Sequence, residues 1–204
     1  KLLSLLTPVA KTFPAEFGLL ANDLAIQVHG GYGYTRDFDV EQLYRDNRLN
    51  PIHEGTSGIQ SLDLLGRKII GDSGESLKIF TKRVVKTCDQ AIQTSLKSDA
   101  NYLLEVIENL ERVCEILINS KDSNTLANYS AFLTGFGHIV VGWIWLDMAI
   151  VALSQKDEDQ YGQPFLNGKI ATSRYFFECE LPKADMLLNF VAKKSDVVSS
   201  VKTE

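Results

Sequence analysis

Apolar residues recur three or four positions apart along most of the chain, which is the spacing of one face of an α-helix. Such a stripe predicts a helix over residues 13–28, where Pro14 suits the first helical turn. A second stripe predicts a helix over residues 57–70, and a shorter helix is predicted over residues 40–46. The first stripe consists of Phe17, Leu20, Leu24 and Val28, and the second of Ile59, Leu62, Leu65 and Ile69.

Four long helical patterns follow, and short polar segments separate them. They cover residues 75–96, 100–118, 124–153 and 165–193. Connections this short favour antiparallel neighbours in a helical bundle. No segment alternates apolar and polar residues with the period of a β-strand, so we predict an all-α fold. An acidic row on the second pattern predicts a solvated face, and it consists of Glu105, Glu108, Glu111 and Glu115.

The sequence "GDSGES", which begins at Gly71, is the clearest break between the two groups of helices. Glycine and serine interrupt a helix, and Ser73 or Ser76 is suited to cap the helix that comes next. We therefore predict two parts: residues 1–71, and a bundle of about four helices over residues 75–204.

Residues 131–153 are the most apolar stretch and are long enough to cross a bilayer at about 1.5 Å per residue. Asp147 and His138 lie inside this stretch. A charge near the centre of a membrane costs about 3 kcal/mol on insertion scales. Since a helix that is apolar all round is also expected in a large soluble core, we predict a central buried helix and no membrane partner.

Composition and charge exclude some classes of binding partner. The chain has 204 residues, of which 45% are hydrophobic and 23% charged, so it can form a substantial core. Its net charge of -5 provides no basic surface for nucleic acid. The three cysteines and three histidines show no metal-binding spacing, so no metal site is predicted. We expect buried, reduced thiols in a cytoplasmic protein.

The segment "QVHGGYGYTRDFDVEQLYRDNRLNPIHEGTSGIQ", residues 27–60, contains the candidate chemistry. Its GGxG spacing, after a predicted helix, does not match the dinucleotide fingerprint, which needs a strand and GxGxxG. Two interpretations remain open. Gly30 and Gly31 either terminate the helix, or form a turn whose missing side chains let a phosphate-bearing ligand approach the backbone.

Glu54 lies between Pro51 and the predicted helix over residues 57–70. A glutamate near a helix start is favoured by about 0.3–1 kcal/mol through the helix dipole, and local physics alone favours this structural role. A catalytic role is the alternative, because helix entrances also hold exposed catalytic groups.

The same 34 residues resemble the C-terminal signature of the acyl-CoA dehydrogenase family. That signature reads Q-x-x-G-G-x-G-[FY], then Y/M-R-D, then I-[YH]-E-G-T-x-x-I-Q. The resemblance implies that the chain is the C-terminal portion of an FAD-dependent enzyme that removes hydrogens from the α and β carbons of an acyl-CoA thioester. Glu54 occupies the position of the base that takes the α-proton, and Gly55 that of backbone beside the thioester.

The resemblance also implies a flavin site. Gln27, Gly30 and Gly31 match residues that lie against the ADP part of FAD bound mainly by a neighbouring subunit. Thr56 and Ser57 match positions near the subunit's own flavin. Such a base needs its pKa raised toward neutrality by an apolar, water-poor site, which we expect the turn between Pro51 and the following helix to provide.

Two positions depart from the family pattern. His53 stands where tyrosine is more common, and Gly58 stands where many members have glutamine, so a side-chain contact to the flavin is in question. Residues 75–204 exceed the usual end of the family and resemble the helical extension of larger members that act on methylthiopropionyl-CoA and related short acyl-CoAs.

The family resemblance further implies an electron-transfer flavoprotein as electron acceptor and a homodimer or homotetramer. It implies that this portion is inactive and flavin-free in isolation. Two other functions stay open: a flavin-binding relative that does not dehydrogenate, and a structural or oligomerisation role for residues 75–204.

Overall fold

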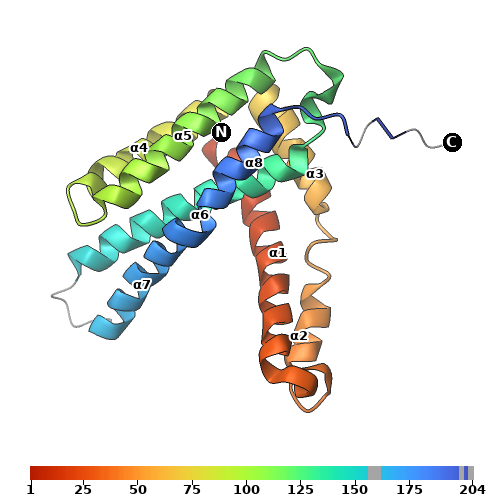
Figure 1. The fold of residues 1–204 in the computed structure, drawn as a ribbon, viewed down its shortest axis with the longest axis vertical. Coiled ribbons are helices and arrows are strands. Elements are labelled where there is room, and N and C mark those ends of the chain that lie inside the picture. The colour runs from red at the N-terminus through yellow and green to blue at the C-terminus, as the bar shows by residue number, and fades with distance from the viewer. Residues whose placement is uncertain (156–161, 198–199, 202–204) are drawn as a thin grey trace.

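The computed structural model describes residues 1–155, 162–197, 200 and 201, and all the regular elements within them are helical. This confirms the predicted all-α fold (Figure 1). The α-helices are α1 (Leu2–His29), α2 (Val40–Asn47), α3 (Ser57–Leu62), α4 (Glu75–Ile92), α5 (Lys97–Ile118), α6 (Tyr129–Ser154), α7 (Gln163–Tyr175) and α8 (Pro182–Ala192). Two 3₁₀ segments, η1 (Gly30–Tyr34) and η3 (Ser123–Leu126), and two π-helical segments, η2 (Asp63–Ile70) and η4 (Phe176–Glu180), complete the set.

Several predicted helices differ from the structure. The helix predicted over residues 57–70 is α-helical only to Leu62 and continues as η2, and two others differ at prolines. The first helix begins at Leu2 and contains both Pro8 and Pro14, so the predicted start at residue 13 is wrong. The predicted helix over residues 165–193 is interrupted by the π-helical turn η4. Proline has no backbone N–H and its ring collides with the carbonyl four residues earlier in a regular helix. In η4 the Leu181 N–H donates to Phe176 O, five residues earlier, at 2.8 Å. This wider turn lies directly before Pro182, where a regular helix would be disturbed.

Helix α6 is the central element, as predicted from its apolar sequence. It contacts α1, α3, α4, α5, α7 and α8. Phe132 and Phe136 on α6 are fully buried, and the Phe136 ring lies 5.1 Å from that of Phe80 on α4. By length and composition α6 could also cross a membrane, and half of its most apolar 18-residue window is buried.

One continuous core joins the residues before and after Gly71. Leu5 on α1 and Leu64, Leu65 and Ile69 on η2 are fully buried. They belong to the same cluster of buried side chains as the residues of α4, α5, α6 and α8. The division into 1–71 and 75–204 remains a prediction about domain organisation, since the packing is continuous across it.

The second half of α1, together with η1 and α2, projects away from the bundle as an arm (Figure 1). Beyond Ala15, α1 has no buried residue, and α2 has none along its length. The predicted stripe on this helix is therefore not part of the core: Leu24 is 55% exposed and Val28 is 85% exposed. Periodicity identified the helix correctly, but the apolar face lacks a covering element among the described residues.

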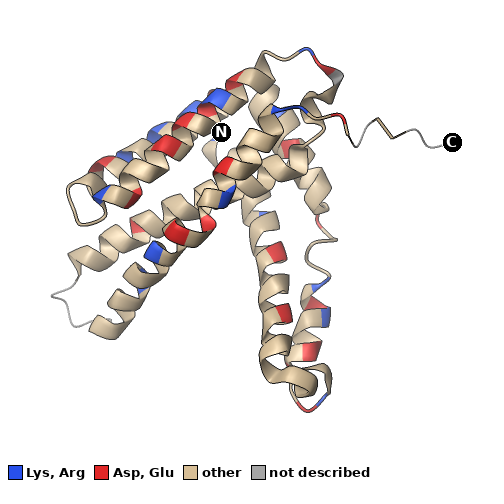
Figure 2. Ribbon diagram, in the orientation of Figure 1, with Lys and Arg blue, Asp and Glu red and all other residues tan. Residues whose placement is uncertain are grey.

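Charged side chains of both signs lie along α4 and α5 (Figure 2). All four glutamates of the predicted acidic row on α5 are exposed, which confirms the predicted solvated face. No group of three or more potential metal-ligating side chains occurs within the part of the chain that the structure describes.

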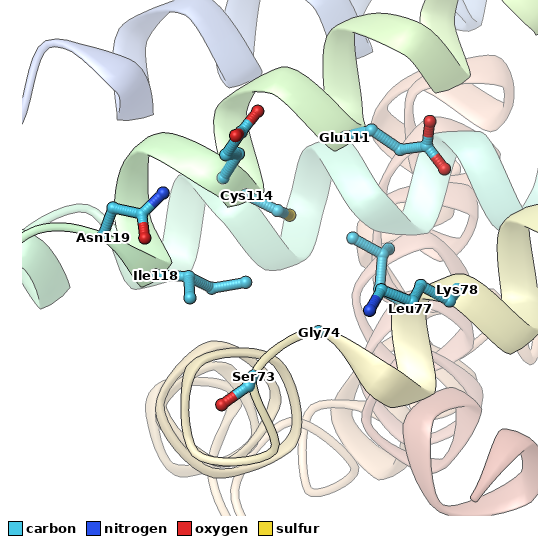
Figure 3. A pocket seen from close by; sticks show the side chains of 9 residues that line it. Ser73, Gly74, Leu77, Lys78, Glu111, Cys114, Ile118 and Asn119 are labelled. Atoms are coloured by element: carbon cyan, nitrogen blue, oxygen red, sulfur yellow. The ribbon is translucent and has the colours of Figure 1, made fainter.

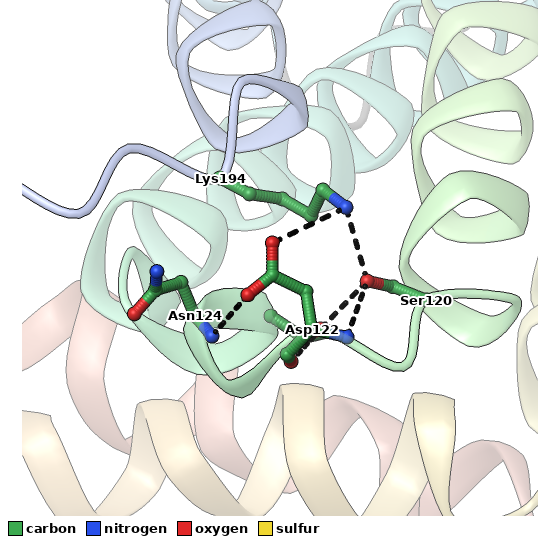
Figure 4. Close-up of polar contacts among 5 residues, drawn as sticks. Ser120, Asp122, Asn124 and Lys194 are labelled. Carbon is green, nitrogen blue, oxygen red and sulfur yellow. Dashed lines mark hydrogen bonds and ion pairs between the residues drawn. The ribbon is translucent and has the colours of Figure 1, made fainter.

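The end of α8 is tied to the loop between α5 and α6 (Figure 4). Lys194 Nζ donates to Ser120 Oγ at 3.1 Å and lies 3.6 Å from Asp122 Oδ2. Asp122 Oδ1 in turn accepts from Asn124 N–H at 2.9 Å and fixes the start of η3. Lys194 thus connects the last helical turn to a distant loop.

We expect Lys194→Ala to loosen only the end of α8. Partly exposed ion pairs contribute about 0–1 kcal/mol, so amide hydrogen exchange at the last turn of α8 should accelerate by up to about fivefold. The matched control is Lys193→Ala, because Lys193 is exposed and has no described ion-pair partner. Equal acceleration in both variants would contradict the role of Lys194.

The three cysteines differ in environment, and the prediction that all are buried is wrong for Cys179, which is exposed on η4. Cys114 lines a cavity of about 310 Å³ between the start of α4 and the end of α5 (Figure 3), yet it is only 1% exposed. Burial raises the pKa of the Cys88 thiol to about 12 and raises that of Cys114 further.

A maleimide reagent is therefore expected to label Cys179 rapidly in the folded protein and to leave Cys88 and Cys114 unlabelled, because the thiolate is the reactive form and both buried thiols stay protonated. Mass spectrometry of peptides before and after denaturation measures this. Rapid labelling of Cys114 in the native state would show that the Figure 3 cavity admits the reagent.

Candidate functional site

Glu54 lies in a cleft of about 320 Å³ between the middle of α1 and the chain that approaches α3. Lys11 and Ala15 line it from α1, and Asn50 and His53 line it from the opposite side. Lys11 Nζ donates to the backbone carbonyl of Asn50 at 2.9 Å, which holds the two sides together. The cleft therefore has one carboxylate, one ammonium group and one imidazole at its walls.

The turn that carries Glu54 has an unusual backbone. Glu54 has φ 57 and Gly55 has φ 86, both in the left-handed region. A non-glycine residue in that region costs about 1–3 kcal/mol and requires support from its surroundings. Gln60 gives that support, because its side-chain amide donates to the Glu54 carbonyl at 3.0 Å. The φ of 86 at Gly55 favours glycine, and a Cβ there would also lie 2.9 Å from the same amide nitrogen, which would have to move.

The structure places Glu54 just before a helix. Helix α3 starts at Ser57, and Thr56 is its N-cap, whose hydroxyl accepts from Ile59 N–H at 3.4 Å. Glu54 lies before the cap and is outside the helix, so it is not a residue of the first turn. The expected apolar enclosure is absent among the described residues, because Glu54 is exposed.

The glycine turn lies at the far end of the arm. Gly30 has φ 61, ends α1, and donates its N–H to Gln27 O. The helix-terminator interpretation is therefore correct. The ligand interpretation remains compatible with it, because a Cβ at Gly30 or Gly31 would meet no atom within 4 Å and the backbone is open to solvent. The Gln27 side chain is also exposed.

The structure separates the predicted site residues into two groups. Glu54, Gly55, Thr56 and Ser57 are consecutive and lie near the middle of α1. Gly30 is at the arm tip, and it follows Ala15 of the cleft by about 22 Å along the helix at roughly 1.5 Å per residue. The two groups therefore cannot meet at one small ligand group.

Two cleft features were missed by sequence reasoning. Lys11 is distant from Glu54 in sequence and belongs to a stretch that showed no motif. Gln60 was part of the quoted segment, but its contact with the Glu54 carbonyl depends on the left-handed turn, which local sequence did not indicate. Gly58 leaves space beside α6, because a Cβ there would lie 3.9 Å from the Tyr129 ring.

Comparisons with known proteins match almost the whole chain. A family model described as "Acyl-CoA dehydrogenase, C-terminal domain" matches residues 3–70, and one described as "Acetyl-CoA dehydrogenase C-terminal like" matches residues 80–202. The 3-methylmercaptopropionyl-CoA dehydrogenase of Ruegeria pomeroyi is 31% identical over 178 residues, which are 84% of this chain and 30% of that protein. A broad-specificity linear acyl-CoA dehydrogenase of Mycobacterium tuberculosis is 26% identical over 89% of this chain and 32% of its own length.

A solved structure shows the same fold. The acyl-CoA dehydrogenase of Bacillus anthracis, crystallised with FAD, superposes with a TM-score of 0.64 at 19% identity. The match covers 97% of this chain and 33% of that one. The chain thus spans about a third of the length of the proteins it matches.

Proposed function

Because the chain belongs to the acyl-CoA dehydrogenase family, we propose that it forms the C-terminal part of an enzyme that dehydrogenates an acyl-CoA thioester, with Glu54 as the base. In the proposed step the Glu54 carboxylate takes the α-proton, the α,β double bond forms, and the β-hydrogen leaves with its electron pair as hydride. FAD, when bound, supplies the acceptor for that hydride.

The geometry of Glu54 is the observation that carries the proposal. The residue occupies a left-handed backbone conformation in a cleft, and Gln60 holds its carbonyl. Strained backbone of this kind persists where a side chain must be aimed, and such positions concentrate at functional sites. Thr56 caps the helix that begins at Ser57, so the backbone of the turn is anchored to a regular element directly after it.

To act as a base, Glu54 needs a more enclosed site than the described residues provide. It is exposed in the described residues, whereas proton abstraction beside a thioester needs a dry site. We propose that other parts of the protein, or a neighbouring subunit, close this cleft over the acyl chain. Gly55, with its left-handed backbone next to the base, is proposed to lie beside the thioester.

The arm-tip residues that are proposed to contact FAD are exposed, so a ligand could reach them. The open backbone at Gly30 and Gly31 and the exposed Gln27 amide would hold the ADP part of a flavin bound mainly by a neighbouring subunit. Thr56 and Ser57, near the base, would contact the subunit's own flavin. The separation of the two groups in the structure is compatible with this assignment to two flavins.

The arm formed by the second half of α1, η1 and α2 also favours an oligomeric state. Its large apolar side chains include the exposed Leu24, Val28 and Leu43, and burial of such a surface stabilises association at about 25 cal/mol per Å². We propose a homodimer or homotetramer in which the arm is covered, with an electron-transfer flavoprotein as electron acceptor and a cytoplasmic location.

Anaerobic mixing of the full-length protein with short acyl-CoA thioesters tests the reaction. The expected result is loss of the visible absorbance of oxidised flavin together with formation of the enoyl-CoA, detected by mass spectrometry. A saturated thioether analogue, which has no acidic α-proton, is the matched control and should leave the flavin oxidised. A protein that binds flavin but yields no enoyl product with any acyl-CoA would be the non-dehydrogenating relative.

A further inference from the structure

Another hollow lies between α1 and the α7–η4 region. Its volume is about 310 Å³. Its walls are mostly apolar and aromatic, from Phe13, Phe17 and Leu20 on α1 and from Tyr175 and Phe176 at the α7–η4 junction. Small-molecule sites are typically apolar hollows of about 300–1,000 Å³ with a few convergent polar groups.

The polar group behind this wall is His138 of α6. Its ring is packed against the rings of Phe13, Phe17 and Phe176 at centroid distances of 5.4, 5.7 and 6.3 Å. It is only 2% exposed. Its Nδ1 lies 2.8 Å from the carbonyl of Thr134, and because a carbonyl can only accept, Nδ1 carries a proton.

The other ring nitrogen of His138 has no hydrogen-bond partner. In the neutral imidazole Nε2 is then an acceptor, and it is buried without a donor. It faces Glu180 Oε2 at 3.7 Å, which is also an acceptor when ionised. In that tautomer neither atom donates to the other. The Glu180 oxygen takes its donor from Lys183 Nζ at 2.6 Å, so Nε2 alone is left without a partner. Buried polar groups are seldom left unpaired, and each such exception needs an explanation.

The chain reaches this point through an unusual element. Phe176 and Glu180 are the first and last residues of the π-helical turn η4. Single π-helical turns inside α-helices occur frequently at functional sites. Here Phe176 and Glu180, at the two ends of this turn, bring an aromatic ring and a carboxylate to the same hollow.

We propose that this hollow binds a small molecule with an apolar body and a primary ammonium head group. The body packs on the aromatic walls. The ammonium has enough N–H donors for both Nε2 of His138 and the Glu180 carboxylate, and its charge is favoured by that carboxylate and by the faces of the surrounding rings. Lys183, whose Nζ lies 2.6 Å from Glu180 Oε2, is half-exposed and is displaced toward solvent when the ligand enters.

Calorimetric titration with benzylamine, benzyl alcohol and toluene tests the proposal at neutral pH. We expect saturable binding of benzylamine and at least about tenfold weaker binding of toluene, since a charge-assisted hydrogen bond accounts for that factor. Glu180→Gln should weaken benzylamine about tenfold and leave toluene unchanged. The matched control, Glu178→Gln, alters an exposed carboxylate that pairs with Arg174 and should change neither affinity.

Lys183→Met separates the ligand site from a purely structural role for the cluster. If Lys183 competes with the ligand, this variant binds benzylamine more tightly; weaker binding contradicts the proposal. The nitrogen resonance of His138 Nε2 should also shift on titration with benzylamine and not with toluene. Equal affinity for all three probes, or no saturable binding while circular dichroism shows a folded protein, overturns the proposal. The experiment uses neither flavin nor acyl-CoA, so it is independent of the proposed enzyme activity.

Discussion

Glu54→Gln in the full-length protein is expected to slow reduction of the flavin by an acyl-CoA about a hundred- to ten-thousand-fold, the range that a positioned general base contributes. The amide has nearly the size of the carboxylate but cannot accept the α-proton. Because Gln60 bonds to the backbone carbonyl of residue 54 and not to its side chain, the turn keeps its geometry. Binding of acyl-CoA should change little, so the loss should appear in the rate of reduction at saturating substrate.

Glu16→Gln is the matched control. Glu16 is an exposed glutamate on α1, next to Ala15 of the cleft, and does not line the cleft itself. Rapid-mixing absorbance measurements of the two variants and the parent protein, under anaerobic conditions, give the comparison. An undiminished rate in Glu54→Gln would show that another group is the base, and an equal loss in both variants would indicate a general charge effect near α1.

Phe136→Ala is expected to reduce the free energy of unfolding by about 3–5 kcal/mol, the usual loss when a buried phenylalanine is truncated. Phe136 is fully buried at the centre of α6, with the ring of Phe80 at 5.1 Å and that of Phe132 at 6.1 Å. The surrounding side chains come from several helices, so they cannot all move inward to fill the space.

Phe190→Ala is the control, since it removes the same atoms from a ring that is 42% exposed on α8. Its effect should be less than half as large, because the transfer free energy scales with the apolar area buried. Urea unfolding followed by circular dichroism measures both. Similar losses for the two variants would mean that the chain does not depend on the α6 core as described.

Local sequence predicted most helices because their apolar faces repeat regularly. The pattern over residues 40–46 and that over residues 100–118 correspond to α2 and α5 with small differences at the ends. The early start of α1 was missed because Pro8 and Pro14 usually mark a helix boundary, and here they lie inside one. Periodicity also cannot show what covers an apolar face, so it did not indicate that the α1 stripe would be exposed.

The candidate site was predicted from a family motif more than from the local physical chemistry of its residues. Physics alone favoured a helix-start role for Glu54, and the structure places the residue before the helix cap. The left-handed turn at Glu54 and Gly55 is held by Gln60 of α3 through a side-chain contact that propensities do not describe. His138 and Glu180 were not predicted to meet, because their approach requires α6, α7 and the π-helical turn to be packed together.

The shared core has an evolutionary consequence. Two distinct family models cover residues 3–70 and 80–202, which suggests segments with separate histories, yet Leu5, Leu64 and Ile69 are buried in one cluster with side chains of the later helices. A lineage that lost the later segment would expose those leucines and that isoleucine to water at once. Without the later segment, α1 and η2 would therefore present an apolar face that needs either polar substitutions or another covering surface.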